Sequence, residues 1–274
     1  MSARARLGRR ITFAVGSILA FAYVTPFFLV FVNSLKLKPD ILANPLTLPS
    51  HITWDNFSQA LTKMNYFRSL TNSIIITTLS VSLLIVFSSM FAYYLARTKS
   101  KLSKWIFLGL VTSMIVPFQA LMIPFMARFA SIVSWNNRAA LIFFYIGFGT
   151  AMSTFLYHGF ISNIPSEIDE AAAIDGASDM TAFWKIIFPM MRPITATVAI
   201  INALWIWNDF LLPRLVLTPE TQTLPLSTYL FYGQYSTEYG QAMAGLLLAV
   251  IPIIAFYLIL QKQFISGISS GAVK

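Results

Sequence analysis

The stretch Asn163–Pro189 reads NIPSEIDEAAAIDGASDMTAFWKIIFP and differs sharply in composition from the rest of the chain. It carries half of the chain's ten acidic residues, which are Glu167, Asp169, Glu170, Asp175 and Asp179. Ser166 favours the start of a helix, the following alanines favour its continuation, and Gly176 is suited to end it in the left-handed conformation. Ser178 can cap a second helix, which we expect Pro189 to close. The stretch therefore predicts a helix, a glycine turn and a second helix.

Long uncharged segments lie on both sides of this stretch. Of the 274 residues, 57% are hydrophobic and 11% are charged, whereas roughly a quarter of the residues in soluble domains are charged. About 20 consecutive apolar residues cross the core of a bilayer. Six segments meet this criterion: residues 11–33, 70–96, 105–127, 139–163, 192–213 and 240–262. The sequence thus predicts an all-α integral membrane protein, with one six-helix transmembrane domain over residues 1–274.

The distribution of lysine and arginine predicts the orientation of these spans. Four arginines precede the first segment, which is too long and too uniformly apolar for a cleaved signal peptide. Four basic residues also crowd the short connection 97–104. Because short cytoplasmic loops are enriched in basic residues, we expect both termini, residues 97–104 and residues 165–189 to face the cytoplasm. The predicted location is the cytoplasmic membrane.

Several classes of function are disfavoured by what the sequence contains. The net charge of +9 resides in short basic clusters beside apolar runs, a pattern typical of membrane topology rather than nucleic-acid binding. The chain has no cysteine and only two histidines, His51 and His158, so no catalytic or metal site is expected. It lacks the Gly-x-x-x-x-Gly-Lys-Ser/Thr loop that cradles nucleotide phosphates. We therefore expect no enzymatic activity and no bound cofactor.

The connection between the first two predicted spans contains a second helical signal. Phe57, Ala60, Leu61 and Met64 recur at helical spacing, which predicts a short amphipathic helix on the outer side. Such a helix lies either in the membrane interface or against an external partner, and the sequence favours neither.

The acidic stretch resembles the Glu-Ala-Ala loop of ABC importer permeases. The matching residues are Glu170, Ala171, Ala172, Asp175, Gly176, Ala177, Phe183, Ile186 and Phe188-Pro189; Phe188 stands where that family usually has leucine. In the family, this loop forms the coupling helices, which sit in a cleft of a cytoplasmic ATPase subunit. The resemblance implies that Glu170, Ala171, Ala172, Asp175, Gly176 and Phe183 couple this chain to such a partner. We refer to residues 165–189 as the Glu-Ala-Ala loop.

Other residues resemble the carbohydrate-uptake branch of that family, the maltose-permease type. They are Asn72-Ser73, Trp207-Asn208-Asp209-Phe210 with Pro213, and the Gly271-Ala272-Val273 tail. The resemblance implies a type I ABC importer permease that moves a sugar by alternating access. It also implies a second permease subunit, two ATPase subunits that bind ATP and Mg²⁺, and an external sugar-binding protein.

The substrate pathway is indicated by a few polar residues within the spans. Trp207 and Asn208 suit a sugar, because its ring faces stack on aromatics and its hydroxyls bond amides. Asp209, the one acid within a predicted span, lies about 25 Å along its helix from Arg192. Asn72 opens the second span. An interfacial position for Trp207 and Asp209, and a helix-bonding role for Asn72, remain open alternatives.

Two other functions remain as alternatives. A gradient-driven carrier usually places ionisable residues inside its spans, and this chain offers Asp209 alone. A membrane scaffold without transport would leave the aromatic and amide residues of the predicted pathway without a purpose. The permease subunit of an ABC sugar importer is the function that the sequence favours.

Overall fold

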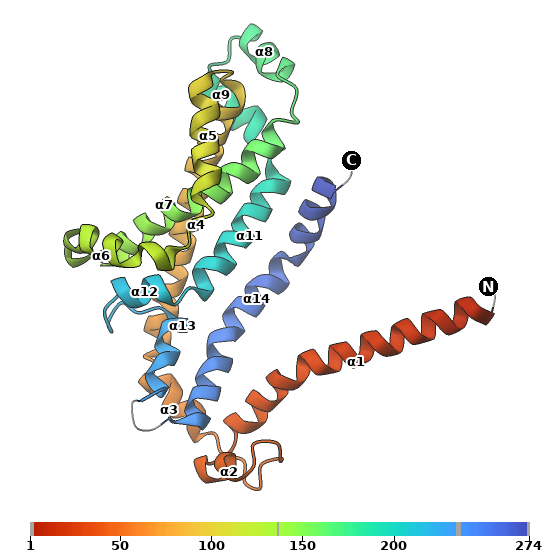
Figure 1. The fold of residues 1–274 in the computed structure, drawn as a ribbon, viewed down its shortest axis with the longest axis vertical. Coiled ribbons are helices and arrows are strands. Elements are labelled where there is room, and N and C mark those ends of the chain that lie inside the picture. The colour runs from red at the N-terminus through yellow and green to blue at the C-terminus, as the bar shows by residue number, and fades with distance from the viewer. Residues whose placement is uncertain (1–2, 136, 234–236, 273–274) are drawn as a thin grey trace. The chain divides into compact units, whose positions relative to one another are not determined.

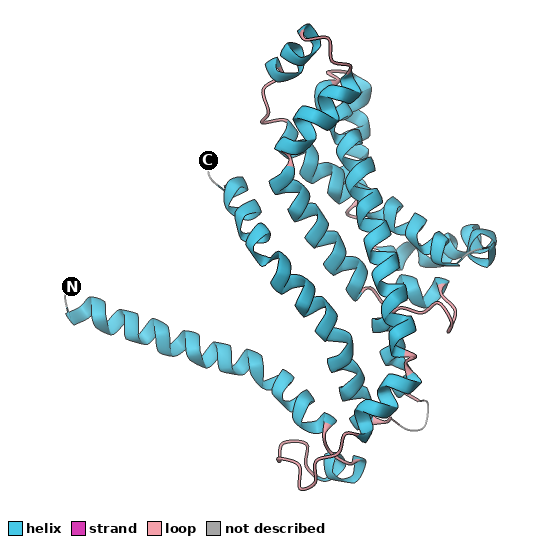
Figure 2. Ribbon diagram, turned by 180° about the vertical axis from the view of Figure 1, so that it is seen from behind, coloured by secondary structure: helices cyan, strands magenta, loops and turns pink. Residues whose placement is uncertain are grey.

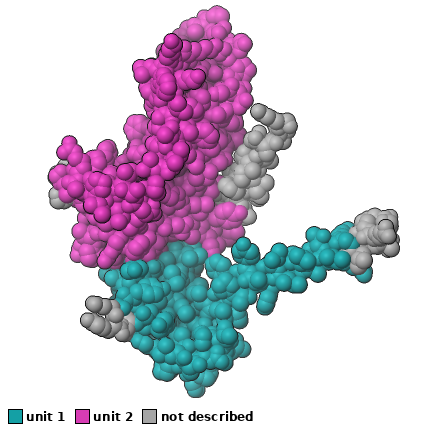
Figure 3. All heavy atoms as spheres, viewed as in Figure 1, with its two compact units in different colours: residues 1–67, 227–252 teal, residues 68–226, 253–274 magenta. Residues whose placement is uncertain are grey.

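A computed structural model describes residues 3–135, 137–233 and 237–272. These residues form helices joined by short loops, as the prediction of an all-α protein required (Figures 1 and 2). The chain divides into two compact units, one of residues 1–67 and 227–252, the other of residues 68–226 and 253–274 (Figure 3). The last residue of the Gly271-Ala272-Val273 tail lies outside the described residues.

The first unit combines the N-terminal helices with the start of the last one. Its elements are α1 (Ala3–Ser34), α2 (Lys38–Ala43), α3 (Asp55–Lys63), the 3₁₀ turn η2 (Thr228–Phe231) and α14 (Tyr239–Ala272) up to Pro252. The amphipathic helix predicted around residues 57–64 is α3, which buries Ala60 on its apolar face, and Met64 is buried directly after its last residue. An ion pair between Lys38 and Glu238 (3.2 Å) joins distant parts of the chain.

The second unit holds most of the remaining helices. They are α4 (Tyr66–Arg97), α5 (Lys101–Ser113), α6 (Phe118–Trp135), α7 (Asn137–Ile161), α8 (Glu167–Ile174), α9 (Asp179–Ala182), η1 (Phe183–Ile187), α10 (Phe188–Met190), α11 (Arg192–Asn208), α12 (Leu211–Val216) and α13 (Leu224–Ser227), the last of which crosses the boundary between the units. Helix α7 is the centre of this unit, because it packs against α5, α6, α11 and α12. Its Leu141, Phe144 and Tyr145 are buried in an apolar core shared with α4 and α12.

Four of the described helices are long and apolar enough to cross a membrane alone. They are Gly8–Ser34, Tyr66–Arg97, Asn137–Ile161 and Tyr239–Ile259. Two further pairs, Lys101–Ser113 with Phe118–Val133 and Asp179–Met190 with Arg192–Asn208, pass the same test together but are bent by 105° and 78°. The described chain thus has four such helices, or six if each bent pair is one span.

The surface of α1 shows why an apolar solvent is required. Phe13, Phe21 and Tyr23 are exposed on different sides of this helix, and among its described side chains, from Gly8 onward, burial is confined to the last turn. A helix that is apolar all round is stable only where lipid or another chain covers it. The helix therefore belongs in a bilayer or against a partner within one.

A span was predicted over residues 105–127, and the structure divides this segment between two helices. Helix α5 ends at Ser113, and α6 begins at Phe118 after a sharp bend. Pro117 explains the break, since it lacks an N–H donor and disfavours the helical conformation at Val116. Counting charges cannot detect this break, because the segment stays apolar throughout.

The segment 192–213 is also interrupted, although we expected its helix to end at Pro213. Helix α11 ends at Asn208, and Asp209 adopts an extended conformation. The Asp209 carboxylate then accepts the N–H of Leu211 (3.1 Å) and so caps the short helix α12. Because the Asp209 side chain stabilises the start of α12, α11 ends before it. Pro213 therefore falls inside α12 rather than at the end of α11.

Candidate functional site

The first half of the Glu-Ala-Ala loop is built as predicted around Gly176. Helix α8 has three acidic residues in its first turn, where the helix dipole favours negative charge. At its end, Ala177 N–H bonds Ala172 O (2.9 Å) and Gly176 N–H bonds Ala173 O (3.0 Å). This pair of bonds defines a Schellman cap, which needs a left-handed residue, and Gly176 supplies it with φ of 81°. The glycine turn is therefore confirmed.

The helix starts on either side of that turn differ from each other. Ser178 caps α9, because its hydroxyl accepts the N–H of Thr181 (3.3 Å). Ser166 precedes α8, but its side chain makes no capping bond. Pro189 does not close the second helix, which corrects another prediction. The π turn η1 shifts the hydrogen bonding so that Phe188 N–H bonds Phe183 O. Pro189 is then the second residue of α10, in the first turn, where a missing N–H costs little.

The outward side of the loop mixes acidic and apolar groups. Ile174 is 87% exposed at the end of α8, next to the turn. Glu170, Ala171 and Asp175 are also exposed, whereas Ala172 is buried. The exposed Ile174 and the exposed carboxylates of Glu170 and Asp175 therefore offer both apolar and polar contacts to another molecule.

Asp169 ties the same helix back to the end of α4. Its carboxylate pairs with the Arg97 guanidinium at 2.8 Å and accepts a hydrogen bond from the Tyr93 hydroxyl at 2.5 Å. Arg97 also donates to the Ile164 carbonyl (3.0 Å), just before the loop. Tyr93, Arg97 and Asp169 line a hollow of about 530 Å³ beside α8 and α9. A displacement of α8 would therefore act directly on α4.

Phe183 fixes the other end of the loop. It is 1% exposed and packs on Tyr93, with ring centroids 5.2 Å apart. Ile187 and Met191 join it in a buried cluster with residues of α4, α7 and α11. Among the predicted coupling residues, Phe183 thus lies in the core beneath the loop, whereas Glu170, Ala171, Asp175 and Gly176 are at its surface.

Asn72, predicted near the start of the second span, lies against the 217–224 segment. Its amide nitrogen donates to the carbonyl oxygens of Gln222 (3.1 Å) and Glu220 (3.4 Å), and its oxygen accepts from Arg138 (3.3 Å). The neighbouring Ser73 hydroxyl accepts the N–H of Leu224 (2.7 Å). Asn72 is thus engaged in holding a connecting segment on α4.

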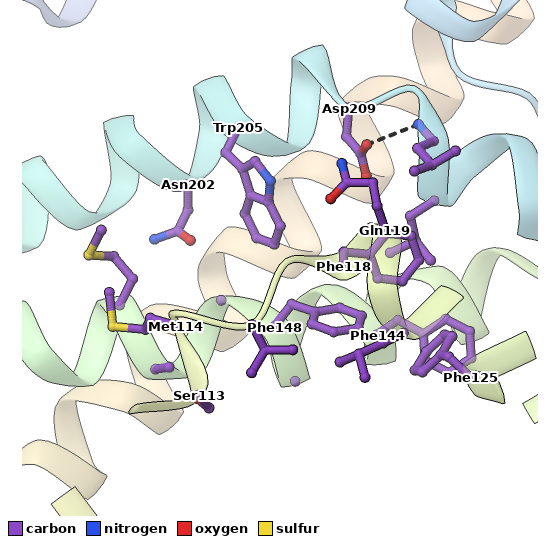
Figure 4. A pocket seen from close by; sticks show the side chains of 18 of the residues that line it. Ser113, Met114, Phe118, Gln119, Phe125, Phe144, Phe148, Asn202, Trp205 and Asp209 are labelled. Atoms are coloured by element: carbon purple, nitrogen blue, oxygen red, sulfur yellow. Dashed lines mark hydrogen bonds between the residues drawn. The ribbon is translucent and has the colours of Figure 1, made fainter. Parts of the chain in front are cut away.

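A cavity of about 880 Å³ lies in the second unit between the bent pair α5–α6 and helices α7 and α11. Its wall is rich in phenylalanine: Phe118, Phe125, Phe129, Phe143, Phe144 and Phe148. Figure 4 shows Asn202, Trp205 and Asp209 turned toward it, with Gln119 near Asp209. Most of the surface is therefore apolar, with few polar groups directed into it.

Some of the residues predicted for a substrate pathway line this cavity, and others do not. Asp209 lines it, and its carboxylate accepts a hydrogen bond from the buried Tyr145 hydroxyl (2.9 Å). Trp207 and Asn208 are not among its lining residues. Trp207 is 7% exposed, and the exposed Asn208 side chain donates to the carbonyl of Leu204 (2.8 Å) on its own helix.

Sequence reasoning missed Asn202, Trp205 and Gln119. Asn202, Trp205 and Asp209 are spaced at i, i+3 and i+7, which places them on one face of a helix. That spacing was visible in the sequence, but nothing in the sequence favoured this face of the helix over the face that carries Trp207. Gln119 reaches the cavity because of the bend before α6, which the apolar pattern does not reveal.

No group of three or more histidine, cysteine or acidic side chains suited to a metal occurs in the part of the chain that the structure describes. His158 stacks on Phe107, with ring centroids 4.0 Å apart. Its geometry is that of a packed aromatic side chain.

These features define a multi-pass membrane protein with an exposed helical loop and an aromatic cavity. Residues 85–270 match the family model described as the inner membrane component of binding-protein-dependent transport systems. The chain belongs to this family of ABC transporter permeases, as the Glu-Ala-Ala loop had indicated.

Similar proteins come from several bacteria. The chain is 40% identical over 261 residues to the probable starch degradation products transport system permease protein AmyC of Thermoanaerobacterium thermosulfurigenes, covering 95% of each chain. It is 39% identical to the melibiose/raffinose/stachyose import permease protein MelC of Bacillus subtilis, covering 97% of this chain and 96% of that one.

The fold is also found in a solved structure. A chain of a bacterial ABC transporter involved in the import of the acidic polysaccharide alginate superposes with a TM-score of 0.82. The match covers 96% of this chain and 99% of that chain at 22% sequence identity. It shows that the two chains share their fold.

Proposed function

We propose that this chain is the permease subunit of an ABC importer that moves a sugar across the cytoplasmic membrane. The exposed Glu-Ala-Ala loop, with its glycine turn and its anchor to α4, is the observation that carries this proposal. The relatives named for the transport of starch degradation products and of melibiose, raffinose and stachyose support a sugar as the substrate class.

The proposed topology has six spans, in which the bent pair α5–α6 counts as one span and α11 as another, while α9, η1 and α10 remain with the Glu-Ala-Ala loop. Both termini and the loop then face the cytoplasm, because twelve of the nineteen basic residues fall on that side. In this orientation, α3 and the 217–224 segment are external. An external sugar-binding protein delivers the substrate to that side.

A cytoplasmic ATPase subunit docks on the loop in this proposal. Glu170, Ala171, Asp175 and Gly176 form the exposed docking surface, with Ala172 packed beneath it; the small Ala171 permits close approach, and Ile174 offers an apolar contact. ATP and Mg²⁺ bind on that partner. The full assembly contains a second permease subunit and two ATPase subunits.

The anchors of the loop suggest how movement is transmitted. A push on α8 reaches α4 through the Asp169–Arg97 ion pair and the Tyr93 hydroxyl. It reaches the core through Phe183 and Ile187, which are buried among residues of α4, α7 and α11. ATP binding shifts the spans between inward-open and outward-open states only if the docked ATPase binds the two states with different affinity.

Uptake by the reconstituted assembly tests this function. The chain is co-purified with its partners in mild detergent and placed in liposomes, and uptake of radiolabelled maltotriose and raffinose is measured with and without ATP. We expect ATP-dependent uptake of at least one of these sugars. Uptake by this chain without the ATPase would favour a gradient-driven carrier, and no flux with any partner set would favour a scaffold. Either result would overturn the proposal.

A further inference from the structure

The aromatic cavity beside α11 combines a large apolar wall with a few convergent polar groups. Pockets for small molecules typically enclose about 300–1,000 Å³ and have this composition, and the cavity of about 880 Å³ falls within that range. We infer that this chain itself binds the sugar, with Trp205 as the stacking surface and Asp209 and Asn202 as hydrogen-bonding groups. This inference rests on the proposed function.

Trp205 is suited to hold the ring of a saccharide. Its side chain is 39% exposed and lines the cavity, although it belongs to a helix whose neighbouring Trp207 is buried. The edge-to-face contact with Tyr145, with centroids 5.4 Å apart, fixes the orientation of the indole. A large, rigid aromatic face is the surface on which the C–H groups of a sugar stack.

Asp209 is held in position before any ligand arrives. Tyr145 donates to one carboxylate oxygen and the Leu211 N–H donates to the other. The N–H groups of Phe210 and Leu212 also bond this carboxylate, so with about four lone-pair sites a sugar hydroxyl would exchange with one of these donors. Vicinal sugar hydroxyls are donors that match two adjacent carboxylate oxygens. These bonds therefore orient the carboxylate at the wall of the cavity.

Asn202 is fixed in a similar way, one helical turn further back than Trp205. Its amide nitrogen donates to the Ser153 hydroxyl (2.9 Å) and to the Val198 carbonyl (2.8 Å). Both bonds use the nitrogen, which leaves the amide oxygen as an acceptor. In Figure 4, Asn202 and Asp209 flank Trp205, an arrangement that lets hydroxyls bond on either side of a stacked ring.

These groups favour a sugar over a lipid tail as the occupant. An acyl chain offers no hydrogen bond to Asp209, Asn202 or Gln119. Filling the cavity with hydrocarbon would leave a carboxylate facing an apolar phase, which is costly. A polyhydroxylated ring satisfies the polar groups and covers the phenylalanines with its C–H faces.

Transport kinetics of the reconstituted full assembly test this inference, using whichever of maltotriose and raffinose the wild-type complex imports. Trp205→Leu removes the aromatic face while keeping an apolar side chain. We expect the KM for uptake, at saturating binding protein, to rise about tenfold, with a smaller fall in the maximal rate. Trp205→Phe should restore most of the affinity. Asp209→Asn should raise the KM about tenfold or more, because it removes a charged acceptor.

Asn208→Ala is the matched control on the same helix. Its side chain lies outside the cavity, so we expect no change in KM. An unchanged KM in Trp205→Leu, or equal effects of Trp205→Leu and Asn208→Ala, would overturn the sugar site and leave the proposed function standing. If the wild-type complex imports neither sugar, the proposed function fails and this inference fails with it.

Discussion

The Glu-Ala-Ala loop and the aromatic cavity are built by opposite means. The loop owes its shape to neighbours in sequence: a glycine at φ 81°, a serine cap and acids in the first turn of α8. The cavity owes its shape to a bend between α5 and α6 and to side chains from five helices, α5, α6, α7, α11 and α12. A loop shaped by residues close in sequence can keep its form while it docks another protein. A cavity shaped by several helices changes when those helices move.

Phe183 belongs to the Glu-Ala-Ala loop by sequence, but its side chain is buried in the core beneath the loop. Phe183→Ala should lower the free energy of unfolding by about 3–5 kcal/mol, because a fully buried phenylalanine leaves a cavity. Thermal unfolding of the detergent-solubilised protein measures this loss. Met180→Ala on the exposed side of α9 is the control and should cost less than about 1 kcal/mol. Equal losses would mean that Phe183 belongs to the docking surface.

The connection between the loop and α4 should have a smaller effect. Asp169→Ala and Arg97→Ala should each cost about 2 kcal/mol, since the ion pair is partly exposed to solvent. The double variant should lose less than the two single losses combined, by about 1 kcal/mol. Glu167→Gln, which neutralises an exposed acid in the first turn of the same helix, should cost less than about 1 kcal/mol. Strictly additive losses would contradict a direct connection between α8 and α4.

The two serines that precede the helices of the loop should have the smallest effects. Ser178→Ala should cost about 1 kcal/mol, because it removes the bond to Thr181 N–H. Ser166→Ala should be nearly neutral, because the side chain of Ser166 makes no capping bond. Unfolding measurements on both variants separate these cases. A loss at Ser166 as large as that at Ser178 would show that the caps are equivalent.

Much of the fold was predictable from local signals. Apolar runs gave the ranges of α1, α4, α7 and α14, and the glycine turn at Gly176 was anticipated from its residue type. These features depend on the length of a segment or on the conformational freedom of one residue.

The breaks were harder to predict, because they depend on competition between neighbouring elements. Pro117 interrupts a uniformly apolar stretch, and Asp209 ends α11 by capping α12. For the cavity, only Asp209 among the predicted pathway residues lines the wall. The choice between Trp205 and Trp207 depends on which face of α11 meets α7, and no pattern within α11 alone determines that.

The number of sugar molecules imported per ATP hydrolysed tests most directly whether the loop couples the two processes. In Gly176→Ala, a Cβ meets no neighbouring atom, so the cost is the strain of positive φ alone, about 1–2 kcal/mol. We predict that this ratio falls about tenfold in the reconstituted assembly while ATP hydrolysis continues. Gly159→Ala, in helix α7 with the same free space, should keep the wild-type ratio. An unchanged ratio in Gly176→Ala would contradict the coupling role of the loop.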